Sequence, residues 1–473
     1  MEVKEEERRC YGESDRQRQE WVSLELPLGD TAESFDLESV VCSHGLFMMA
    51  PNRWDPLSKT LFRPLQLTLF PTSDSDSVMV CVSQPQDRPR CLHLRVHAGT
   101  RSLTLENEEA LLAQVSRMLR LSEYDDRVAR EFRELYGEEE EEGSVVGRVF
   151  RSPTLFEDMV KCMLLCNCQW PRTLSMAEAL CDLQLELRLK SLLAGKAQDF
   201  TPKTPAGREV EPKKKLRNSK ASKCLAAQFT VETKAELEPH SNNISMVEVQ
   251  LTSQDLSPSS LLSVPKDNGL CEQLCSADLD LLCDPQLSRD TGFDRIGNFP
   301  TPTELAKLDE NFLAKRCKLG YRAGRIVRLA QGIVEGRIQL RQLEETCMER
   351  SLSSYSKLAE KLRRIDGFGP FTCANVLICM GYYHVIPTDS ETIRHLKQVH
   401  ARESTIRTME TDVQKIYAKY APFQFLAYWS EMWSFYEKRF GKLSEMPCSA
   451  YKLITASNMR TNPRKQNKRK KTG

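Results

Sequence analysis

Two glycines one residue apart, Gly367 and Gly369, most constrain what this chain can fold into; they stand in the segment IDGFGP, residues 365–370. Glycine adopts backbone dihedrals that side chains disfavour, so the pair predicts a tight turn. Pro370 suits the first position of a new helix, because its missing N–H would have no partner there. The run 371–380 is apolar enough to be buried. The segment therefore predicts two helices joined by a hairpin, with the N-terminus of the second helix left bare.

A bare helix N-terminus beside two glycines allows two interpretations. The free amides and the positive end of the helix dipole attract anions, and glycine lets a phosphate backbone come close. Most glycine pairs of this kind, however, are ordinary turns. Both interpretations stay open on the hairpin alone.

Asp389 follows the buried helix in the segment PTDSE, residues 387–391, just before a helical run over 392–400. Aspartate is a favoured N-cap residue, which is the structural interpretation. The functional interpretation is a catalytic carboxylate. The two are compatible, because a cap also fixes a carboxylate in place.

This region resembles the helix-hairpin-helix (HhH-GPD) DNA glycosylase superfamily, whose mark is a hairpin of the form L-x-G-hydrophobic-G and, after one helix, a loop with an essential aspartate. The residues in register are Leu362, Ile365, Gly367, Phe368, Gly369, Thr372, Ala374 and Asp389. The resemblance implies an enzyme of base excision repair. Its partner would be duplex DNA containing a damaged base, and Asp389 would serve hydrolysis of the N-glycosidic bond.

The resemblance also implies how DNA would be held. The hairpin residues expected to contact phosphates are Gly367, Phe368, Gly369, Phe371 and Thr372. A monovalent cation is expected at the main-chain carbonyls of Arg363, Ile365 and Phe368. Asn167, with Gln169 as its neighbour, matches the wedge that fills the hole left by a flipped base. Alternatively, Asn167 caps the C-terminus of the preceding helix.

Phe371 departs from part of this family. Bifunctional members place a lysine two residues after the second hairpin glycine, where its amine forms a Schiff base with the sugar. Phenylalanine cannot do this, so we expect a monofunctional N-glycosylase without AP-lyase activity. The string FTCAN, residues 371–375, resembles the alkyladenine branch, whereas the N-terminal sheet and the Asn167 region resemble the 8-oxoguanine branch. The lesion therefore stays open. The alternative function is a non-catalytic DNA-binding or scaffold protein that has lost turnover.

Hydrophobic patterning predicts an α+β chain, in which a small antiparallel β-sheet domain precedes a helical region. The resemblance implies that this region is an all-α helix-hairpin-helix glycosylase module of two helical halves. Alternating residues predict strands at 22–28, 65–69, 78–82, 92–96 and 103–105, and helical spacing begins at Glu108. The predicted domains are a disordered N-terminus (1–20), the sheet (21–107), the first helical part (108–187), a disordered insertion (188–288), the second helical part with the hairpin and Asp389 (289–445), and a basic disordered tail (446–473).

An aromatic stripe near the end of the second helical part is predicted to be core, on a helix that ends at Gly441. Its members are Phe425, Trp429, Met432, Trp433 and Tyr436. Helical spacing of large apolar residues is typical of a buried face.

Composition adds limits. The net charge is +1 over 473 residues, so any nucleic-acid site must come from local charge. The sequence contains no run of 18 apolar residues that could span a membrane, and its first residues lack a signal-peptide core. We therefore expect the 17 cysteines to be reduced thiols. Neither a CxxC pair nor four closely spaced cysteines for an iron–sulfur cluster is found, and no cofactor is expected to be required. The basic stretch 463–471 predicts nuclear import or loose tethering to DNA, and we expect a monomer.

Overall fold

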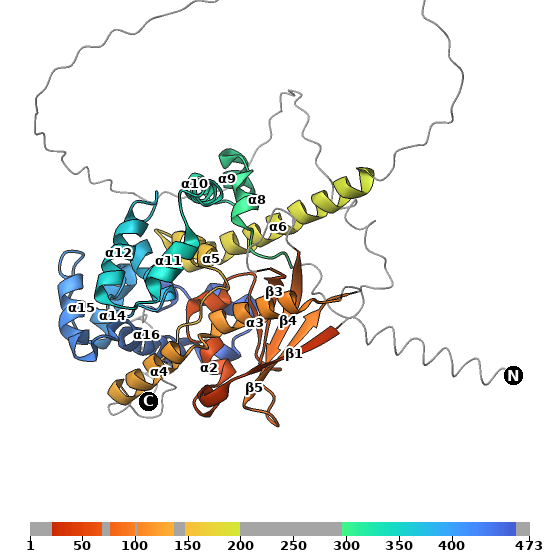
Figure 1. Cartoon of the computed structure of the whole chain (residues 1–473). Helices are drawn as coiled ribbons and strands as arrows, with labels where there is room; N and C mark the ends of the chain where they lie inside the picture. The colour runs from red at the N-terminus through yellow and green to blue at the C-terminus, as the bar shows by residue number, and fades with distance from the viewer. Residues whose placement is uncertain (1–20, 69–75, 100–101, 137–146, 199–295, 460–473) are drawn as a thin grey trace, which may run out of the picture. The chain divides into compact units, whose positions relative to one another are not determined.

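The computed structural model of the chain describes residues 21–68, 76–99, 102–136, 147–198 and 296–459. These residues form a five-stranded sheet and many helices that belong to one unit of the chain (Figure 1). The predicted α+β class is confirmed. The segment 200–288, most of the predicted insertion, lies outside the described residues. Helices contradict the predicted boundaries at 188 and 446, and the other domain boundaries stay predictions.

The sheet is antiparallel throughout, with strand order β1-β5-β4-β3-β2. Its strands are β1 (Trp21–Pro27), β2 (Arg53–Asp55), β3 (Thr60–Gln66), β4 (Ser77–Ser83) and β5 (Cys91–His97). Successive side chains of a strand point to opposite faces. In β5 this alternation buries Leu92, Leu94 and Val96 completely.

Three strand predictions need correction. The segment 103–105 is not a strand, because Thr104 caps the helix α3 (Leu105–Leu119) in a reciprocal capping box with Asn107. That local pairing of side chain and backbone favours a helix start over the alternation of Leu103 and Leu105. The predicted segment 65–69 covers only the end of β3, and β2 was missed because it is very short.

Of the other α-helices, α2 (Leu37–Val41) lies in the sheet region and the rest cover both predicted halves of the helical part. They are α4 (Glu123–Tyr136), α5 (Leu155–Leu165), α6 (Trp170–Gln198), α8 (Pro302–Ala306), α9 (Glu310–Arg316), α10 (Arg322–Val334), α11 (Leu340–Cys347), α12 (Leu352–Arg363), α13 (Pro370–Cys379), α14 (Ser390–Val399), α15 (Met409–Tyr417) and α16 (Gln424–Phe440). Helix α6 continues past position 188, where the insertion was predicted to start. Residues 187–198 include good helix formers such as leucine, lysine and alanine, which explains the longer helix.

Helix α5 is the central helix of the core. It packs against α13 and α6, and it also anchors the sheet. Arg63 on β3 donates from Nη2 to Glu157 Oε2 at 2.6 Å, and Lys161 Nζ lies 2.7 Å from Glu157 Oε1, with all three side chains buried. Buried charges of this kind must be paired to be tolerated. The sheet and the helices therefore share one interior.

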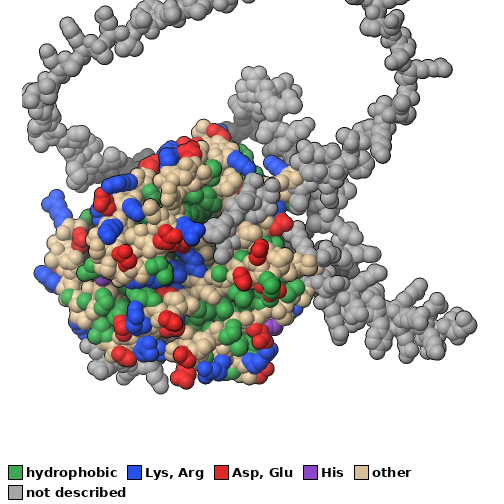
Figure 2. Space-filling model, viewed as in Figure 1, with side chains coloured by type: hydrophobic (Ala, Val, Ile, Leu, Met, Phe, Trp, Pro, Cys, Tyr) green, Lys and Arg blue, Asp and Glu red, His purple; other side chains and the backbone are tan. Residues whose placement is uncertain are grey.

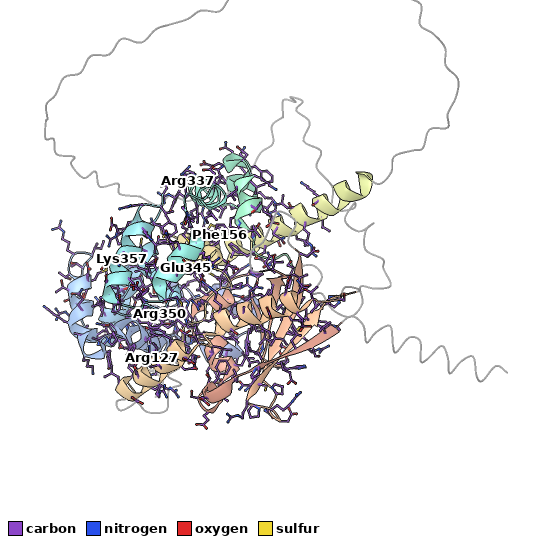
Figure 3. The ribbon with its side chains drawn as sticks, in the orientation of Figure 1. Arg127, Phe156, Arg337, Glu345, Arg350 and Lys357 are labelled. Carbon is purple, nitrogen blue, oxygen red and sulfur yellow. The ribbon has the colours of Figure 1, made fainter. Side chains whose placement is uncertain are left out.

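Segments outside α5 are joined by similar contacts. Arg350, labelled in Figure 3, follows α11 and places its guanidinium 4.1 Å from the centre of the Tyr124 ring at the start of α4.

On the face shown in Figure 2, Lys and Arg side chains are interspersed with Asp and Glu, in keeping with the small net charge. Among the described helices, none is long and apolar enough to cross a membrane.

Residues 446–459 correct the predicted disordered tail. They form the short helices η5 (Cys448–Leu453) and α17 (Ala456–Met459). Tyr451 is buried, and its ring meets Phe47 edge-on with centroids 5.5 Å apart. Just before them, the Ser444 carbonyl accepts a hydrogen bond from Trp54 Nε1 at 2.9 Å. The apolar residues here are too few and too irregularly spaced to give a periodic signal. Residues 460–473 lie outside the described part of the chain.

Candidate functional site

The two predicted helices around the glycine pair are α12 and α13, joined by a turn over residues 364–369. Gly367 has φ +88°, in the left-handed region where side chains are disfavoured. Gly369 has φ −76°, and a Cβ added to it would meet no heavy atom within 4 Å. The prediction that both glycines satisfy backbone dihedrals therefore holds for Gly367 and is wrong for Gly369. At Gly369, the lack of a side chain leaves open space in front of the helix.

The N-terminus of α13 is uncapped. Gly369 is the N-cap residue and provides no side-chain hydrogen bond, and Pro370 has no N–H. The first amides of a helix have no partner within the helix, which leaves those of Phe371 and Thr372. They face a groove of about 950 Å³ that is also lined by Arg325, Arg363 and Arg364.

Two of the three carbonyls predicted to bind a cation already accept one hydrogen bond each. Ile365 O accepts from Phe368 N at 3.1 Å, and Phe368 O accepts from the Cys373 thiol at 3.6 Å. A carbonyl oxygen has two lone pairs, so each retains capacity for a further ligand. The cation site stays a prediction.

Asn167 and Gln169 are both exposed and lie at the end of α5. Asn167 lines the groove, while Gln169 lines a neighbouring cavity. Asn167 has φ +47° just beyond the C-cap residue Cys166, a position where asparagine is common. This left-handed backbone is compatible with the capping interpretation of Asn167, although Cys166 is the C-cap residue itself. The wedge role stays a prediction.

Asp389 is the N-cap of α14, as its structural interpretation predicts. Its Oδ1 accepts from Glu391 N at 2.9 Å, from Thr392 N at 3.1 Å and from Thr392 Oγ1 at 3.3 Å. No described residue donates a hydrogen bond to Oδ2. Burial raises the pKa of Asp389, the bonds from Thr392 and the Glu391 amide limit the rise, and the Glu391 carboxylate adds to it. One oxygen is therefore fixed, while the other is left for a ligand.

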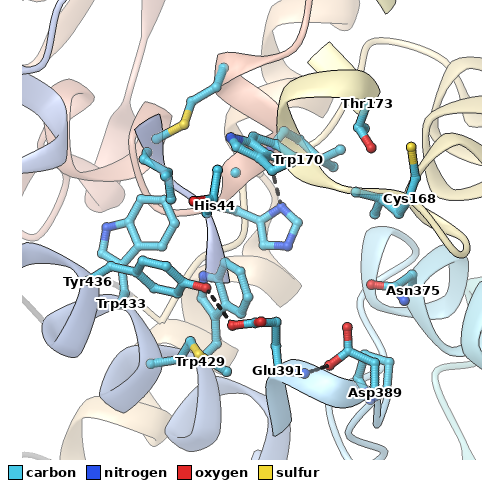
Figure 4. A pocket seen from close by; sticks show the side chains of 18 of the residues that line it. His44, Cys168, Trp170, Thr173, Asn375, Asp389, Glu391, Trp429, Trp433 and Tyr436 are labelled. Atoms are coloured by element: carbon cyan, nitrogen blue, oxygen red, sulfur yellow. Dashed lines mark hydrogen bonds between the residues drawn. The ribbon is translucent and has the colours of Figure 1, made fainter. Parts of the chain in front are cut away.

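The neighbouring cavity measures about 580 Å³, and eight aromatic rings are among the side chains that line it. Figure 4 shows Asp389 and Asn375 on one side of it and Tyr436, Trp433 and Trp429 on the other, with His44 and Trp170 between them. The rings that line the cavity are His44, Trp170, Phe371, Phe425, Tyr428, Trp429, Trp433 and Tyr436. Asp389 and Phe371 line both the cavity and the groove. The carboxylate therefore stands where the two spaces meet.

His44 is neutral in this cavity. Burial, assisted by the charge of Arg120, lowers the pKa of its imidazole from 6.5 to about 3. Its Nδ1 accepts from Leu46 N at 3.4 Å, so the proton of the neutral ring belongs on Nε2, which points into the cavity (Figure 4). The ring lies 4.6 Å from that of Trp429, centroid to centroid.

Glu391 lies beside Asp389 at the cavity. Its Oε2 accepts from Arg394 Nε at 2.7 Å and from the Tyr436 hydroxyl at 3.3 Å. These contacts join the Glu391 carboxylate to Arg394 on α14 and to Tyr436 on α16. Glu391 Oε2 is therefore occupied by two donors, whereas Asp389 keeps Oδ2 accessible.

The sequence prediction missed much of this cavity. The aromatic stripe on α16 was predicted as core, which is correct for the buried Phe425 and Met432, but all five of its residues also line the cavity. His44 and Trp170 carried no signal, because neither belongs to a motif or a periodic face. The residues 44–48, which include the short helix η2 (Gly45–Met48), bring the N-terminal sheet region to the same site.

No family model matches the sequence, and no curated protein matches it. Among solved structures, the chain is similar to a 3-methyladenine DNA glycosylase from Archaeoglobus fulgidus, at 14% identity and a TM-score of 0.45, covering 86% of this chain and 98% of that one. It is also similar to the apo form of an 8-oxoguanine glycosylase/lyase from Clostridium acetobutylicum, at 12% identity and a TM-score of 0.38, covering 81% and 98%. These structural neighbours are DNA glycosylases, the class of protein that the hairpin segment resembles.

Proposed function

We propose that this chain is a monofunctional DNA N-glycosylase of base excision repair, which flips a damaged base out of duplex DNA and hydrolyses its N-glycosidic bond with Asp389. One observation carries the proposal: Asp389, with one carboxylate oxygen free of hydrogen bonds from the described residues, stands where an aromatic cavity meets the groove of the hairpin. A sugar at this junction would have its base in the cavity and its phosphates in the groove.

The groove suits a phosphate backbone. The uncapped amides of α13 and the open space at Gly369 admit close approach of phosphate oxygens. Arg325, Arg363 and Arg364 line the same groove and supply positive charge. Such contacts hold any sequence, so they position the duplex without selecting a base.

The cavity suits a flat, polar-edged ring. Its volume of about 580 Å³ falls within the range of about 300–1,000 Å³ typical of ligand pockets. Aromatic walls stack on an extruded base, whose edge is then read by a few polar groups. The groups available for this are His44 Nε2–H and the Asn375 side chain, whose Nδ2 already donates to Phe371 O at 2.9 Å.

The chemistry follows from charge. Breaking the base–sugar bond leaves positive, oxocarbenium-like charge on the deoxyribose. Asp389 Oδ2 would stabilise that charge and orient a water molecule, whose oxygen bonds to the anomeric carbon while the base departs with the bonding electrons. The proton that the water loses would pass to the carboxylate and then, through solvent, to the departing base, so that a neutral free base and an ionised Asp389 remain. No lysine is among the described residues that line the cavity or the groove, which supports a path without a Schiff base.

A panel of duplexes, each with one damaged base, tests the proposal. The full-length protein should release a free base from at least one duplex and leave an intact abasic strand. Borohydride should trap little covalent protein–DNA adduct, because the main path contains no Schiff base. Efficient trapping would contradict the monofunctional assignment.

The alternative, a non-catalytic DNA-binding or scaffold protein, gives a different result in the same experiment. It predicts binding of the duplexes without release of any base. Nuclear localisation, a monomeric state and independence of any cofactor are also part of the proposal, and each awaits its own measurement.

A further inference from the structure

A second cluster of polar side chains lies behind the helix that carries Asp389. It consists of His395 on α14, His400 at the C-cap of α14, and Glu431 on α16. One potential ligand atom from each residue lies within 4.8 Å of the others. Glu431 Oε1 lies 3.1 Å from His395 Nε2 and 2.7 Å from His400 Nε2.

Only some of the polar atoms in this cluster have hydrogen-bond partners. The Tyr417 hydroxyl lies 3.3 Å from His395 Nε2 and 3.1 Å from His400 Nε2, and it donates to Glu431 Oε2 at 3.0 Å. Glu431 Oε1, by contrast, is buried and receives no hydrogen bond of acceptable geometry from any described residue, although both imidazoles are close. A buried carboxylate oxygen that lacks a well-aligned hydrogen-bond donor is costly. A cation between the three ligand atoms would remove that cost.

We propose that His395, His400 and Glu431 bind one divalent transition-metal ion of the Zn²⁺ type. Two imidazole nitrogens and one carboxylate oxygen are ligands that zinc accepts, with one position left for water. Softer sites would use thiolates, and calcium or magnesium sites would use oxygen ligands throughout.

The distances are compatible with such an ion. Zinc bonds of about 2.0–2.2 Å in tetrahedral geometry separate ligand atoms by roughly 3.4 Å. The observed separations of 3.1 and 2.7 Å from Oε1 need to widen by less than about 1 Å. His395 is fully buried, whereas the side chains of His400 and Glu431 are 26% and 21% exposed, so an ion can enter from that side.

Neighbouring groups would orient the ligands. The Tyr417 hydroxyl fixes Glu431 Oε2 and leaves Oε1 for the metal, as hydrogen bonds around metal sites commonly do. The rings of Tyr428 and Phe435 lie 5.5 and 6.4 Å from that of His395, centroid to centroid, and exclude water from its side of the cluster.

A metal here would reinforce the helix that presents Asp389. The ion would join α14 to α16, which are already linked near Asp389 by the 3.1 Å contact between the Thr392 and Tyr428 hydroxyls. Its role would be structural, because its ligands are absent from the linings of the cavity and the groove. The proposal does not depend on the glycosylase function, since metal binding is measured without DNA.

The test uses the full-length protein, stripped with a chelator, dialysed and titrated with Co²⁺ and then Zn²⁺. We expect one equivalent of Co²⁺ with the visible absorption of a tetrahedral nitrogen–oxygen site, displaced by Zn²⁺. Sulfur-to-cobalt charge-transfer bands should be absent, which separates this site from the chain's cysteines. Zn²⁺ should also raise the melting temperature, because it binds only the folded state.

Two conservative variants and a matched control complete the test. Loss of a group that merely supports a ligand typically lowers metal affinity 10- to 100-fold, so His400→Gln and Glu431→Gln, which remove a ligand, should each lower it by about 100-fold or more. His93→Gln on β5 should leave it unchanged. Both ligand variants change partly exposed side chains, and circular dichroism verifies their fold. Absence of binding by the wild type, retention of binding by either ligand variant, or a sulfur-ligated spectrum would each overturn the proposal and leave a hydrogen-bonded network.

Discussion

Gly369→Leu separates the two tasks of the hairpin, because this glycine has an ordinary φ of −76° and open space around it. Adding a side chain lowers the entropy of the unfolded chain, which stabilises the protein by about 0.4–1 kcal/mol. Replacing glycine by an aliphatic residue at an N-cap costs a similar amount, up to about 1 kcal/mol. The two effects offset one another, so the free energy of unfolding should change by less than about 1 kcal/mol.

Duplex binding should respond much more strongly. A leucine side chain at this position fills the space through which a phosphate would reach the amides of Phe371 and Thr372. Loss of one hydrogen bond to a charged group costs about 1.5–3 kcal/mol, which corresponds to about 10- to 150-fold in affinity. Fluorescence anisotropy with an undamaged duplex measures this loss. The slope of log K against log salt should become shallower by about 0.9 only for each phosphate that the leucine also displaces from Arg325, Arg363 or Arg364, because a neutral amide releases no counterion.

Two further variants interpret the result. Ser356→Leu adds the same side chain to an exposed position of α12 outside the groove and should bind like the wild type. Gly367→Ala should instead destabilise the fold by about 1–2 kcal/mol, because Gly367 is left-handed at φ +88°. Wild-type duplex affinity in a stable Gly369→Leu protein would refute the assignment of this helix end to phosphate.

Other perturbations give distinct outcomes. Burial raises the pKa of Asp389, so the contribution of this carboxyl group to stability is fully present below its unfolded pKa near 3.8 and is lost as pH rises through the folded value. At pH 7, Asp389→Asn should therefore have a higher melting temperature than the wild type. Calorimetry should find no such gain below about pH 4. Burial lowers the pKa of His44 from 6.5 to about 3, so the wild type should lose stability as pH falls through that interval. His44→Gln should lose less stability over the same interval in acid denaturation. Equal acid sensitivity of the two proteins would contradict this. Deleting 460–473 should leave the melting temperature unchanged and reduce nuclear accumulation in cell imaging. Deleting 446–473 also removes the buried Tyr451 and should lower the free energy of unfolding by on the order of 3 kcal/mol or more. Equal melting temperatures of the two truncated proteins would show that residues 446–459 contribute nothing to stability.

Local signals allowed the centre of the site to be predicted from the sequence. Pro370 after a glycine pair places a helix start, and Asp389 before a helical run places an N-cap, because both features depend on residues close together in the chain. The strands β1, β4 and β5 followed from alternation for the same reason. Thr104 shows the limit, since a capping box ended an apparent strand.

The cavity could not be predicted, because its walls come from parts of the chain that are far apart. His44, Trp170 and Trp433 belong to three separate segments and meet only in the folded protein. Helical periodicity identifies the inward face of α16, but a face that lines a cavity and a face in solid core share the same spacing. Tyr451 was missed for a related reason: a single buried ring fixes its segment without any repeated pattern.

The central claim is that Asp389 performs the chemistry, and the single-turnover rate of base release by Asp389→Asn tests it most directly. Asparagine keeps the size and the capping ability of aspartate but lacks its charge. On a duplex from which the wild type releases a base, the variant should bind with similar affinity and react on the order of a hundredfold or more slowly, as expected when one transition-state contact is lost. Asp309→Asn, the same substitution at the exposed N-cap of α9 and outside the linings of the cavity and the groove, serves as the matched control and should react at a rate close to that of the wild type. Base release by Asp389→Asn at the wild-type rate would contradict the account.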